Sequence, residues 1–425
     1  MSIKSLIEQL TAGFYNNHLA DIYGDSSTIE YQIERYISAI NSYASIYGDA
    51  DVEVYSAPGR TEIGGNHTDH QHGQVLAAAV ELDSIAVVSK TDGGLVRITS
   101  EGYDEIVISV AELQQVEAEK ETTKSLVKGV LAGIKNKGYA IGGFNAYITS
   151  DVLIGAGLSS SAAFETLIGT IVSGLYNDMS ISPVDIAIIG QYAENEYFGK
   201  PCGLMDQMAS SVGNLVHINF ADPKSPVVDK IDYDMAKSSY SLCITHTKGS
   251  HEDLTPEYAA VPSEMKAVAR YFGQEVLLGI TEEMLLENIS HIRRQLGDRA
   301  VLRALHFVAE NKRVEQQVNA LKANDINTFL KDVKDSGDSS YKYLQNVYSS
   351  SDVTHQNMSI ALAFSDTFLG DNGVSRVHGG GFAGTIQAFV RNDMVDGYIK
   401  HMDSVFGANS CTRLTLRRCG GVKVI

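Results

Sequence analysis

The stretch DVLIGAGLSSSAAFE, from Asp151 to Glu165, is the part of the chain that says most about its fold. A short strand-like run leads into Gly155 and Gly157, and three serines then open a segment with helical periodicity. A helix that follows a glycine turn presents unpaired backbone N–H groups at the positive end of its dipole, which favours a bound anion such as phosphate. Taken alone, the stretch is equally consistent with a structural turn whose serines cap the helix.

Strand-like and helical segments alternate on both sides of this stretch. Short β-branched or aromatic runs bounded by turn formers predict strands at 51–55, 85–88, 95–100, 106–110, 144–150, 215–220, 242–247, 384–390 and 412–416. Helical periodicity predicts helices over 159–176, near 392–406 and through most of 256–369, and Ser182 before Pro183 indicates another helix start. Residues 56–73 are predicted to be rich in turns. The polar run 221–225 would separate two α+β halves.

Composition and charge exclude several classes of function. The 425 residues include 34 basic and 52 acidic side chains, so the net charge is −18. Such a field repels nucleic acid and anionic lipid, and we expect neither as a partner. The four cysteines are too scattered for a disulfide framework or a zinc cluster. The N-terminus lacks the apolar core of a signal peptide, and no run approaches about 18 apolar residues, so we expect a soluble cytoplasmic protein.

A second segment, SAPGRTEIGGNHTDHQHG from Ser56 to Gly73, combines one arginine, two acids and three histidines between turn residues. This composition suits recognition of a small polar ligand. His67, His70 and His72 also raise the alternative of a metal site, but nothing in the spacing makes three imidazoles converge on one ion. A solvated loop with incidental polar residues is the other alternative.

Two further segments contain residues suited to chemistry. GKPCGLMDQMASSVG, from Gly199 to Gly213, places Asp206 among apolar side chains, either as a helix cap or as a functional carboxylate. SRVHGGGFAGTIQAF, from Ser375 to Phe389, has three consecutive glycines, which allow close packing against a ligand or against another chain segment. Alone, such a run is more often a tight structural turn.

Together, the four segments resemble the galactokinase branch of the GHMP small-molecule kinases, in that family's order and over most of the chain. Matches at four separated places make coincidence a poor explanation. The matched positions are Pro58, Gly59, Arg60, His67, Thr68 and Asp69; Gly155, Gly157, Leu158, Ser159, Ser160, Ser161 and Ala162; Pro201 to Gln207; and Gly379, Gly380, Gly381, Phe382 and Gly384.

The resemblance implies an α+β, two-lobe GHMP kinase fold. An N-terminal lobe like ribosomal protein S5 would span residues 1–222, and a ferredoxin-like lobe would span 223–425. Sugar and ATP would bind between them, and the γ-phosphoryl group would pass to the anomeric hydroxyl of a hexose, with galactose the leading candidate. ATP and Mg²⁺ are the implied cofactors, and we expect a monomer.

The resemblance also implies roles for individual residues. Asp206 would orient or deprotonate the anomeric hydroxyl, and Arg60 would hold that hydroxyl and the phosphoryl group while keeping Asp206 ionised. Sugar contacts would come from Asn66, His67, Asp69, the backbone of Gly203 and the hydroxyl of Tyr258. Nucleotide contacts would come from Gly155, Ala156, Gly157, Leu158, Ser159, Ser160 and Ser161. Ser161 and Glu194 would lie near Mg²⁺, with a helix-surface acid as the equal alternative for Glu194.

The chain departs from the family pattern at several positions. Asn66 stands where a glutamate usually contacts the sugar near its 6-position, and Glu62 stands where an asparagine is usual. His378 replaces a threonine of the glycine turn, and an arginine pair after Tyr258 is missing. A site without a carboxylate at position 66 would repel the carboxylate of galacturonate less, so a galacturonokinase is one alternative. A non-catalytic galactose and ATP sensor is another, although the Ser-Ala pair missing from the sensing paralogue is present here at 161–162.

Overall fold

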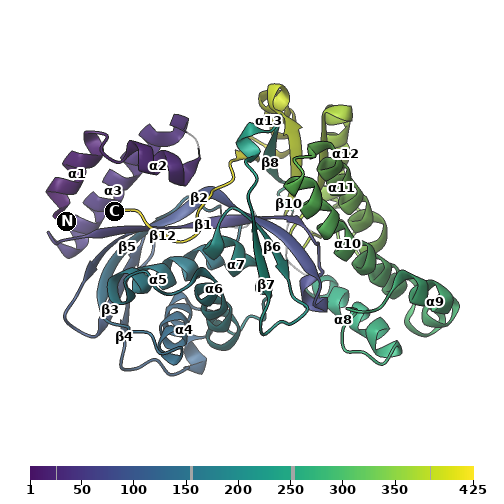
Figure 1. Cartoon of the computed structure of the whole chain (residues 1–425), viewed down its shortest axis with the longest axis horizontal. Helices are drawn as coiled ribbons and strands as arrows, with labels where there is room; N and C mark the ends of the chain where they lie inside the picture. Colours follow the sequence, from purple (N-terminus) through teal and green to yellow (C-terminus); the bar gives the residue numbers. More distant parts are fainter. Residues whose placement is uncertain (25, 154–156, 250–253, 383) are drawn as a thin grey trace.

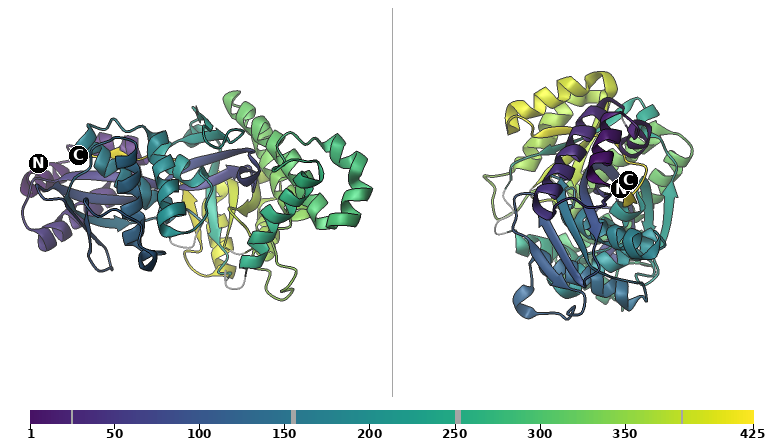
Figure 2. Two further views of the ribbon diagram at one scale, coloured as in Figure 1. Left: turned by 90° about the horizontal axis from the view of Figure 1, so that it is seen from below. Right: turned by 90° about the vertical axis from the view of Figure 1, so that its left-hand side faces the viewer.

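The structure, a computed structural model, describes residues 1–24, 26–153, 157–249, 254–382 and 384–425. Within these ranges the strands form one eight-stranded and one four-stranded sheet, and helices pack against both (Figure 1). Met1 and Ile425 accept backbone hydrogen bonds from Val52 and Val54 at 2.9 Å, so the two termini lie close together (Figure 2). None of the helices in these ranges has the length and apolar character needed to cross a membrane.

The larger sheet has the strand order β12-β1-β2-β5-β3-β4, and β6 joins it by pairing with both β2 and β7. Its strands are β1 (Glu53–Gly64), β2 (Gln74–Lys90), β3 (Leu95–Ser100), β4 (Ile106–Ser109), β5 (Phe144–Ser150), β6 (Leu215–Asn219), β7 (Val227–Ile231) and β12 (Val422–Lys423). Because β7 and β12 follow residue 222 in the chain, this sheet crosses the domain boundary expected there. That boundary stays a prediction.

Helices cover both faces of this sheet. They are α1 (Ile3–Thr11), α2 (Asn16–Tyr23) and α3 (Ile29–Tyr47) on one face, and α4 (Thr123–Asn136), α5 (Ser160–Asn177) and α6 (Pro183–Tyr192) on the other. Successive side chains of a strand point to opposite faces. Val54 accordingly packs with α1–α3 and Tyr55 with α4–α6, and both are fully buried.

Residues 56–64 are strand, and our prediction of turns there is wrong. They continue β1, whose pairing with β2 shifts register between Pro58 and Arg60. Proline and glycine usually mark turns, but a bulge accommodates both inside a buried strand. The helix predicted at 159–176 is confirmed as α5, and Ser182 caps α6 by accepting a hydrogen bond from the Asp185 N–H at 3.0 Å.

The smaller sheet has the strand order β11-β8-β10-β9 and belongs to the second half of the chain. Its strands are β8 (Tyr240–His246), β9 (Gly373–His378), β10 (Thr385–Arg391) and β11 (Cys411–Leu414). The stretch predicted to be mostly helical forms α8 (Thr255–Tyr271), α9 (Glu282–Leu296), α10 (Asp298–Lys322), α11 (Ile326–Ser339) and α12 (Asn357–Leu369), and α13 (Val395–Phe406) follows β10. Both α10 and α11 also contact β1, so this half of the chain reaches the segment that carries Arg60.

Candidate active site

Arg60 on β1 and Asp206 in the first turn of α7 (Met205–Val212) form a two-point ion pair. Arg60 Nε donates to Asp206 Oδ1 at 2.7 Å, and Nη2 donates to Oδ2 at 2.5 Å. Burial raises the pKa of the Asp206 carboxyl, but the charge and hydrogen bonds of Arg60, with a hydrogen bond from Ser159, outweigh burial and leave the pKa below its usual value. With 31% of its side chain exposed, Asp206 is an ionised carboxylate within reach of a ligand.

The same arginine fixes the serine segment. Arg60 Nη1 donates to the Gly157 carbonyl, and the Arg60 backbone N–H donates to the Leu158 carbonyl at 3.0 Å. Gly157 has a φ of +72°, and a Cβ there would lie 2.9 Å from Thr385 Oγ1 on β10. The segment is therefore held between β1 and β10. Gly155 and Ala156, which we also predicted to bind nucleotide, lie outside the described residues.

A cavity of about 1250 Å³ begins where α5 begins. Ser160 and Ser161 lie on its wall, together with apolar side chains such as Ile98, Phe164 and Phe198. Ser159, at the N-cap position, makes no capping hydrogen bond with its side chain, so it does not satisfy the first amide groups of the helix. The apolar wall can accommodate a flat base, and the unpaired amide groups where the wall ends can accommodate a phosphate chain.

A second cavity, of about 650 Å³, lies at the Arg60–Asp206 pair, and both residues are on its wall. The predicted sugar-contacting residues on that wall are Asn66, His67, Asp69 and Gly203. A Cβ at Gly203 would lie 2.2 Å from Asp69 Oδ2, so the carboxylate approaches this closely only because residue 203 is glycine. Burial lowers the pKa of His67, whose neutral ring donates from Nε2 to the Gly380 carbonyl at 2.9 Å.

Tyr258 lies beside this cavity and is not on its wall. Its hydroxyl donates to the Gly381 carbonyl at 2.7 Å, and its ring packs edge-on against Phe382. The structure therefore places Tyr258 as a support for the glycine turn.

His70 and His72 do lie on the cavity wall. Burial lowers the pKa of His70 to about 4, and its Nδ1 accepts a hydrogen bond from the Gln71 amide at 3.1 Å. Across the described ranges, no three His, Cys, Asp or Glu side chains gather in a way that could hold a metal ion. His70 and His72 therefore share the wall of one cavity with His67 and Asp206.

Asn66 differs from our expectation. We expected its amide to contact the sugar, but Asn66 is fully buried and every hydrogen-bonding position of its amide is occupied. Nδ2 donates to Glu62 Oε1 at 3.1 Å and to the Gly379 carbonyl at 2.7 Å, and Oδ1 accepts from Ser340 Oγ at 3.2 Å and Asn346 Nδ2 at 2.8 Å. The amide holds the segment 62–66 to the glycine turn and has no bond left for a ligand.

Two residues of α10, which sequence reasoning missed, anchor the same segment. His306 Nε2 donates to the Asn66 carbonyl at 2.9 Å, and Glu310 Oε1 accepts from the Gly65 N–H at 3.0 Å. Burial lowers the pKa of His306 to about 4. Burial raises the pKa of Glu310, but the charges of His306 and Arg313 outweigh this effect and lower that pKa to about 2. Their spacing of four residues along one helix face is the only signal in the sequence, and it does not identify the partner segment.

Two acidic side chains meet beside the serine segment. Gln207 Nε2 donates to Glu194 Oε2 at 2.8 Å and to Glu165 Oε2 at 3.1 Å. Burial and the neighbouring Glu194 raise the pKa of Glu165 well above its ordinary value, and its buried Oε1 has no hydrogen-bond partner among the described residues. Ser161 precedes Glu165 by one turn of α5. Carboxylate and hydroxyl oxygens are the ligands Mg²⁺ prefers, so these residues fit a magnesium ion carried with the nucleotide.

Comparisons with known proteins agree with these features. The galactokinase galactose-binding signature matches residues 41–90, and the GHMP kinases N-terminal domain matches residues 125–214. The chain is 30% identical over 375 residues to the galactokinase of Actinobacillus pleuropneumoniae serotype 5b (strain L20), covering 87% of this chain and 92% of that one. It is 30% identical over 389 residues to the galactokinase of Glaesserella parasuis serovar 5 (strain SH0165), covering 89% and 96% of the two chains.

Solved structures show the same fold. Galactokinase of Lactococcus lactis, crystallised with galactose, superposes with a TM-score of 0.78 at 23% identity, over 91% of this chain and all of that one (100%). A mevalonate kinase superposes with a TM-score of 0.59 at 15% identity, over 86% and 99% of the two chains. The predicted two-lobe α+β fold is confirmed. The chain belongs to the galactokinase family, a sugar-kinase branch of the ATP-using GHMP kinases.

Proposed function

We propose that this protein is a galactokinase, which transfers the γ-phosphoryl group of ATP to the anomeric hydroxyl of galactose. The observation that carries the proposal is the position of the Arg60–Asp206 pair. Asp206 lines the 650 Å³ cavity, while Arg60 contacts both Asp206 and the carbonyl of Gly157 in the serine segment. One pair of side chains thus connects a cavity large enough for a small ligand such as a sugar with the start of the helix that would hold the phosphates.

In this proposal Asp206 orients the attacking oxygen. Phosphoryl transfer requires in-line positioning and stabilisation of spread negative charge more than covalent chemistry. Asp206 accepts a hydrogen bond from the anomeric hydroxyl and directs its oxygen at the γ-phosphorus. Because the pKa of Asp206 is lowered, the carboxylate takes the proton only late, when the new P–O bond has made the hydroxyl acidic and the bond to ADP is breaking. Arg60 stabilises the negative charge on the phosphoryl group in transit.

The nucleotide would occupy the 1250 Å³ cavity, with its base on the apolar wall and its phosphates at the serine segment. Gly157, Leu158, Ser159, Ser160 and Ser161 are the described residues that we propose as nucleotide contacts. Ser161 and Glu194 would hold Mg²⁺, which neutralises charge on the phosphates when bound.

On the sugar side, we propose contacts from Asp69, His67 and the Gly203 backbone. A carboxylate suits this role, because charge-assisted hydrogen bonds to hydroxyls are roughly twice as strong as neutral ones. The galacturonate alternative assumed that the change to Asn66 removes a carboxylate from the sugar cavity. Glu62 lies on the cavity wall, so a carboxylate is still present there and galactose stays the proposed substrate. A monomeric state and a cytoplasmic location stay predictions from the sequence.

An ADP-release assay over free hexoses and uronic acids tests the proposal, with the phosphorylated position assigned by NMR. We expect galactose to be the best substrate and galactose 1-phosphate to be the product. Faster turnover of galacturonate would overturn the proposed substrate. Galactose binding measured by calorimetry without any ADP release would instead identify a non-catalytic sensor.

A further inference from the structure

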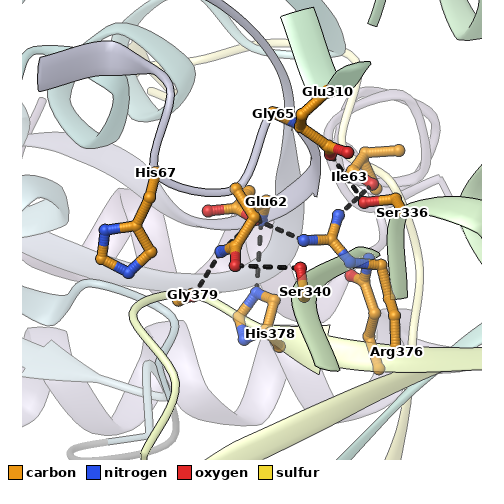
Figure 3. A network of polar contacts seen from close by, with 12 residues as sticks. Glu62, Ile63, Gly65, His67, Glu310, Ser336, Ser340, Arg376, His378 and Gly379 are labelled. Atoms are coloured by element: carbon orange, nitrogen blue, oxygen red, sulfur yellow. Dashed lines mark hydrogen bonds and ion pairs between the residues drawn. The ribbon is translucent and has the colours of Figure 1, made fainter. Parts of the chain in front are cut away.

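Glu62 carries a carboxylate on the wall of the 650 Å³ cavity that none of the proposed contacts uses. The residue is 4% exposed, and its oxygens have different surroundings. Oε1 accepts from Arg376 Nη2 at 2.7 Å and from Asn66 Nδ2 at 3.1 Å, whereas Oε2 accepts no hydrogen bond from any part of the chain that the structure describes. Figure 3 shows Glu62 with Arg376 on one side and the cavity residue His67 on the other.

The surroundings hold this carboxylate in one orientation. Arg376 is fully buried, and its Nη1 donates to the Ile63 carbonyl at 2.7 Å. The Glu62 backbone N–H donates to His378 Nε2 at 3.2 Å, and His378 Nδ1 lies 2.9 Å from Thr385 Oγ1. Both ends of the residue are therefore fixed, and Oε2 cannot turn away from the cavity without breaking the bonds of Oε1. Because Glu62 lies on the cavity wall and Oε2 has no donor within the described residues, this oxygen can accept a hydrogen bond from a ligand hydroxyl.

Asn66 cannot provide this function, because its amide is saturated by Glu62, Gly379, Ser340 and Asn346. The side chains of Glu62 and Asn66 contact each other directly, but their roles differ. Asn66 holds the segment to the glycine turn, and Glu62 presents a carboxyl oxygen to the cavity. Burial raises the pKa of Glu62, and the charge of Arg376 opposes this effect. The cavity thus has a second carboxylate on its wall, in addition to Asp69, beyond the Arg60–Asp206 pair.

We propose that Glu62 is a specificity-determining residue, whose Oε2 accepts a hydrogen bond from one sugar hydroxyl other than the reacting one. This inference depends on the proposed function, since it assumes a sugar in the cavity. It also defines the substrate class as a neutral hexose. A uronic acid would place its own carboxylate near Glu62 and Asp69, where like charges repel.

Glu62→Gln tests the inference, because it keeps the size of the side chain and removes the charge-assisted acceptor. The experiment measures kcat/KM for galactose and for its 2-, 3-, 4- and 6-deoxy analogues in the wild-type enzyme and the variant. We expect Glu62→Gln to lower kcat/KM about fivefold to tenfold for galactose. For one deoxy sugar, the one that lacks the partner hydroxyl, the variant and the wild type should be equally efficient. Glu315→Gln makes the same chemical change at an exposed position outside the cavity and serves as the control.

A loss of the same factor for every sugar would overturn the inference, since it would show a purely structural role, and so would an unchanged kcat/KM for galactose. If Glu62→Gln does not fold, Glu62→Asp provides the test, because it keeps the charge beside Arg376 and withdraws the free oxygen from the cavity. We again expect the variant and the wild type to be equally efficient with one deoxy sugar, the one that lacks the partner hydroxyl. If the wild-type enzyme releases no ADP with galactose, the proposed function itself is rejected. This result differs from a failure of the Glu62 inference, in which the wild-type enzyme stays active.

Discussion

Arg60 and Asp206, 146 residues apart in the chain, face each other with both Asp206 oxygens bonded by the guanidinium. Paired in this way, each lowers the cost of burying the other, and the carboxylate keeps its charge in a mostly buried position. The pair also ties α7 to β1 and, through the Gly157 carbonyl, to the serine segment. Removing one charge would leave the other buried without its partner, so substitutions that keep the size or the charge of the side chain are the ones that probe the chemical step.

Asp206→Asn should abolish most turnover and leave ligand binding measurable. The amide keeps the shape of the side chain but cannot take up the proton of the anomeric hydroxyl, so we expect kcat to fall at least about a hundredfold. Calorimetry should still detect galactose and ATP binding. Asp396→Asn, at an exposed position in the first turn of α13, is the matched control. Wild-type kcat in Asp206→Asn would reject the assigned role.

Arg60→Lys should slow phosphoryl transfer while keeping a positive charge. A lysine offers one flexible ammonium group, whereas Arg60 bonds both Asp206 oxygens and the Gly157 carbonyl at once. We expect kcat at saturating galactose to fall about a hundredfold, with a smaller change in galactose affinity. Arg97→Lys, at an exposed ion pair with Glu105, should be neutral. A fall of less than about tenfold in Arg60→Lys would count against stabilisation of the phosphoryl group by the guanidinium.

Gly203→Ala should weaken sugar binding selectively. The new Cβ would lie 2.2 Å from Asp69 Oδ2, and the end of a short side chain moves more easily than the backbone. The fold should survive while Asp69 leaves its position, so we expect the KM for galactose to rise about tenfold and the KM for ATP to stay the same. Gly93→Ala, where a Cβ would meet nothing within 4 Å, is the control. An unchanged galactose KM would show that Asp69 does not contact the sugar from this position.

Local patterns in the sequence predict much of this structure. The strands at 95–100 and 144–150 and the Ser182 cap depend on neighbouring residues, and they match the observed elements. The strand β1 was missed beyond residue 55, because Pro58 and Gly59 indicate a turn unless the partner strand and its bulge are known.

The contacts that define the cavity could not be predicted in the same way. Arg376 reaches Glu62 across 314 positions of sequence, and Glu310 reaches Gly65 across 245. No local rule links such distant residues. The sequence shows Glu62 and Asn66 as two separate departures from the family pattern. Only the hydrogen bond between the two side chains shows that the departures are linked.

Acid should destabilise the protein through His306, whose ring is buried between the Asn66 carbonyl and Ser339. Burial, despite the opposing charge of Glu310, lowers its pKa from 6.5 to about 4. Between these values the unfolded chain binds a proton that the folded protein does not, so stability falls as the pH falls from 6.5 toward 4. For this one group the loss in free energy of unfolding should reach about 2 kcal/mol at pH 5.

His306→Gln isolates this contribution, because glutamine can still donate to the Asn66 carbonyl and does not titrate. Urea unfolding at pH 7 and pH 5 should show that the variant is less stable at pH 7 but loses about 2 kcal/mol less than the wild type on acidification. His355→Gln, at an exposed side chain, should lose as much as the wild type. Equal losses in the wild type and in His306→Gln would mean that His306 is not held neutral.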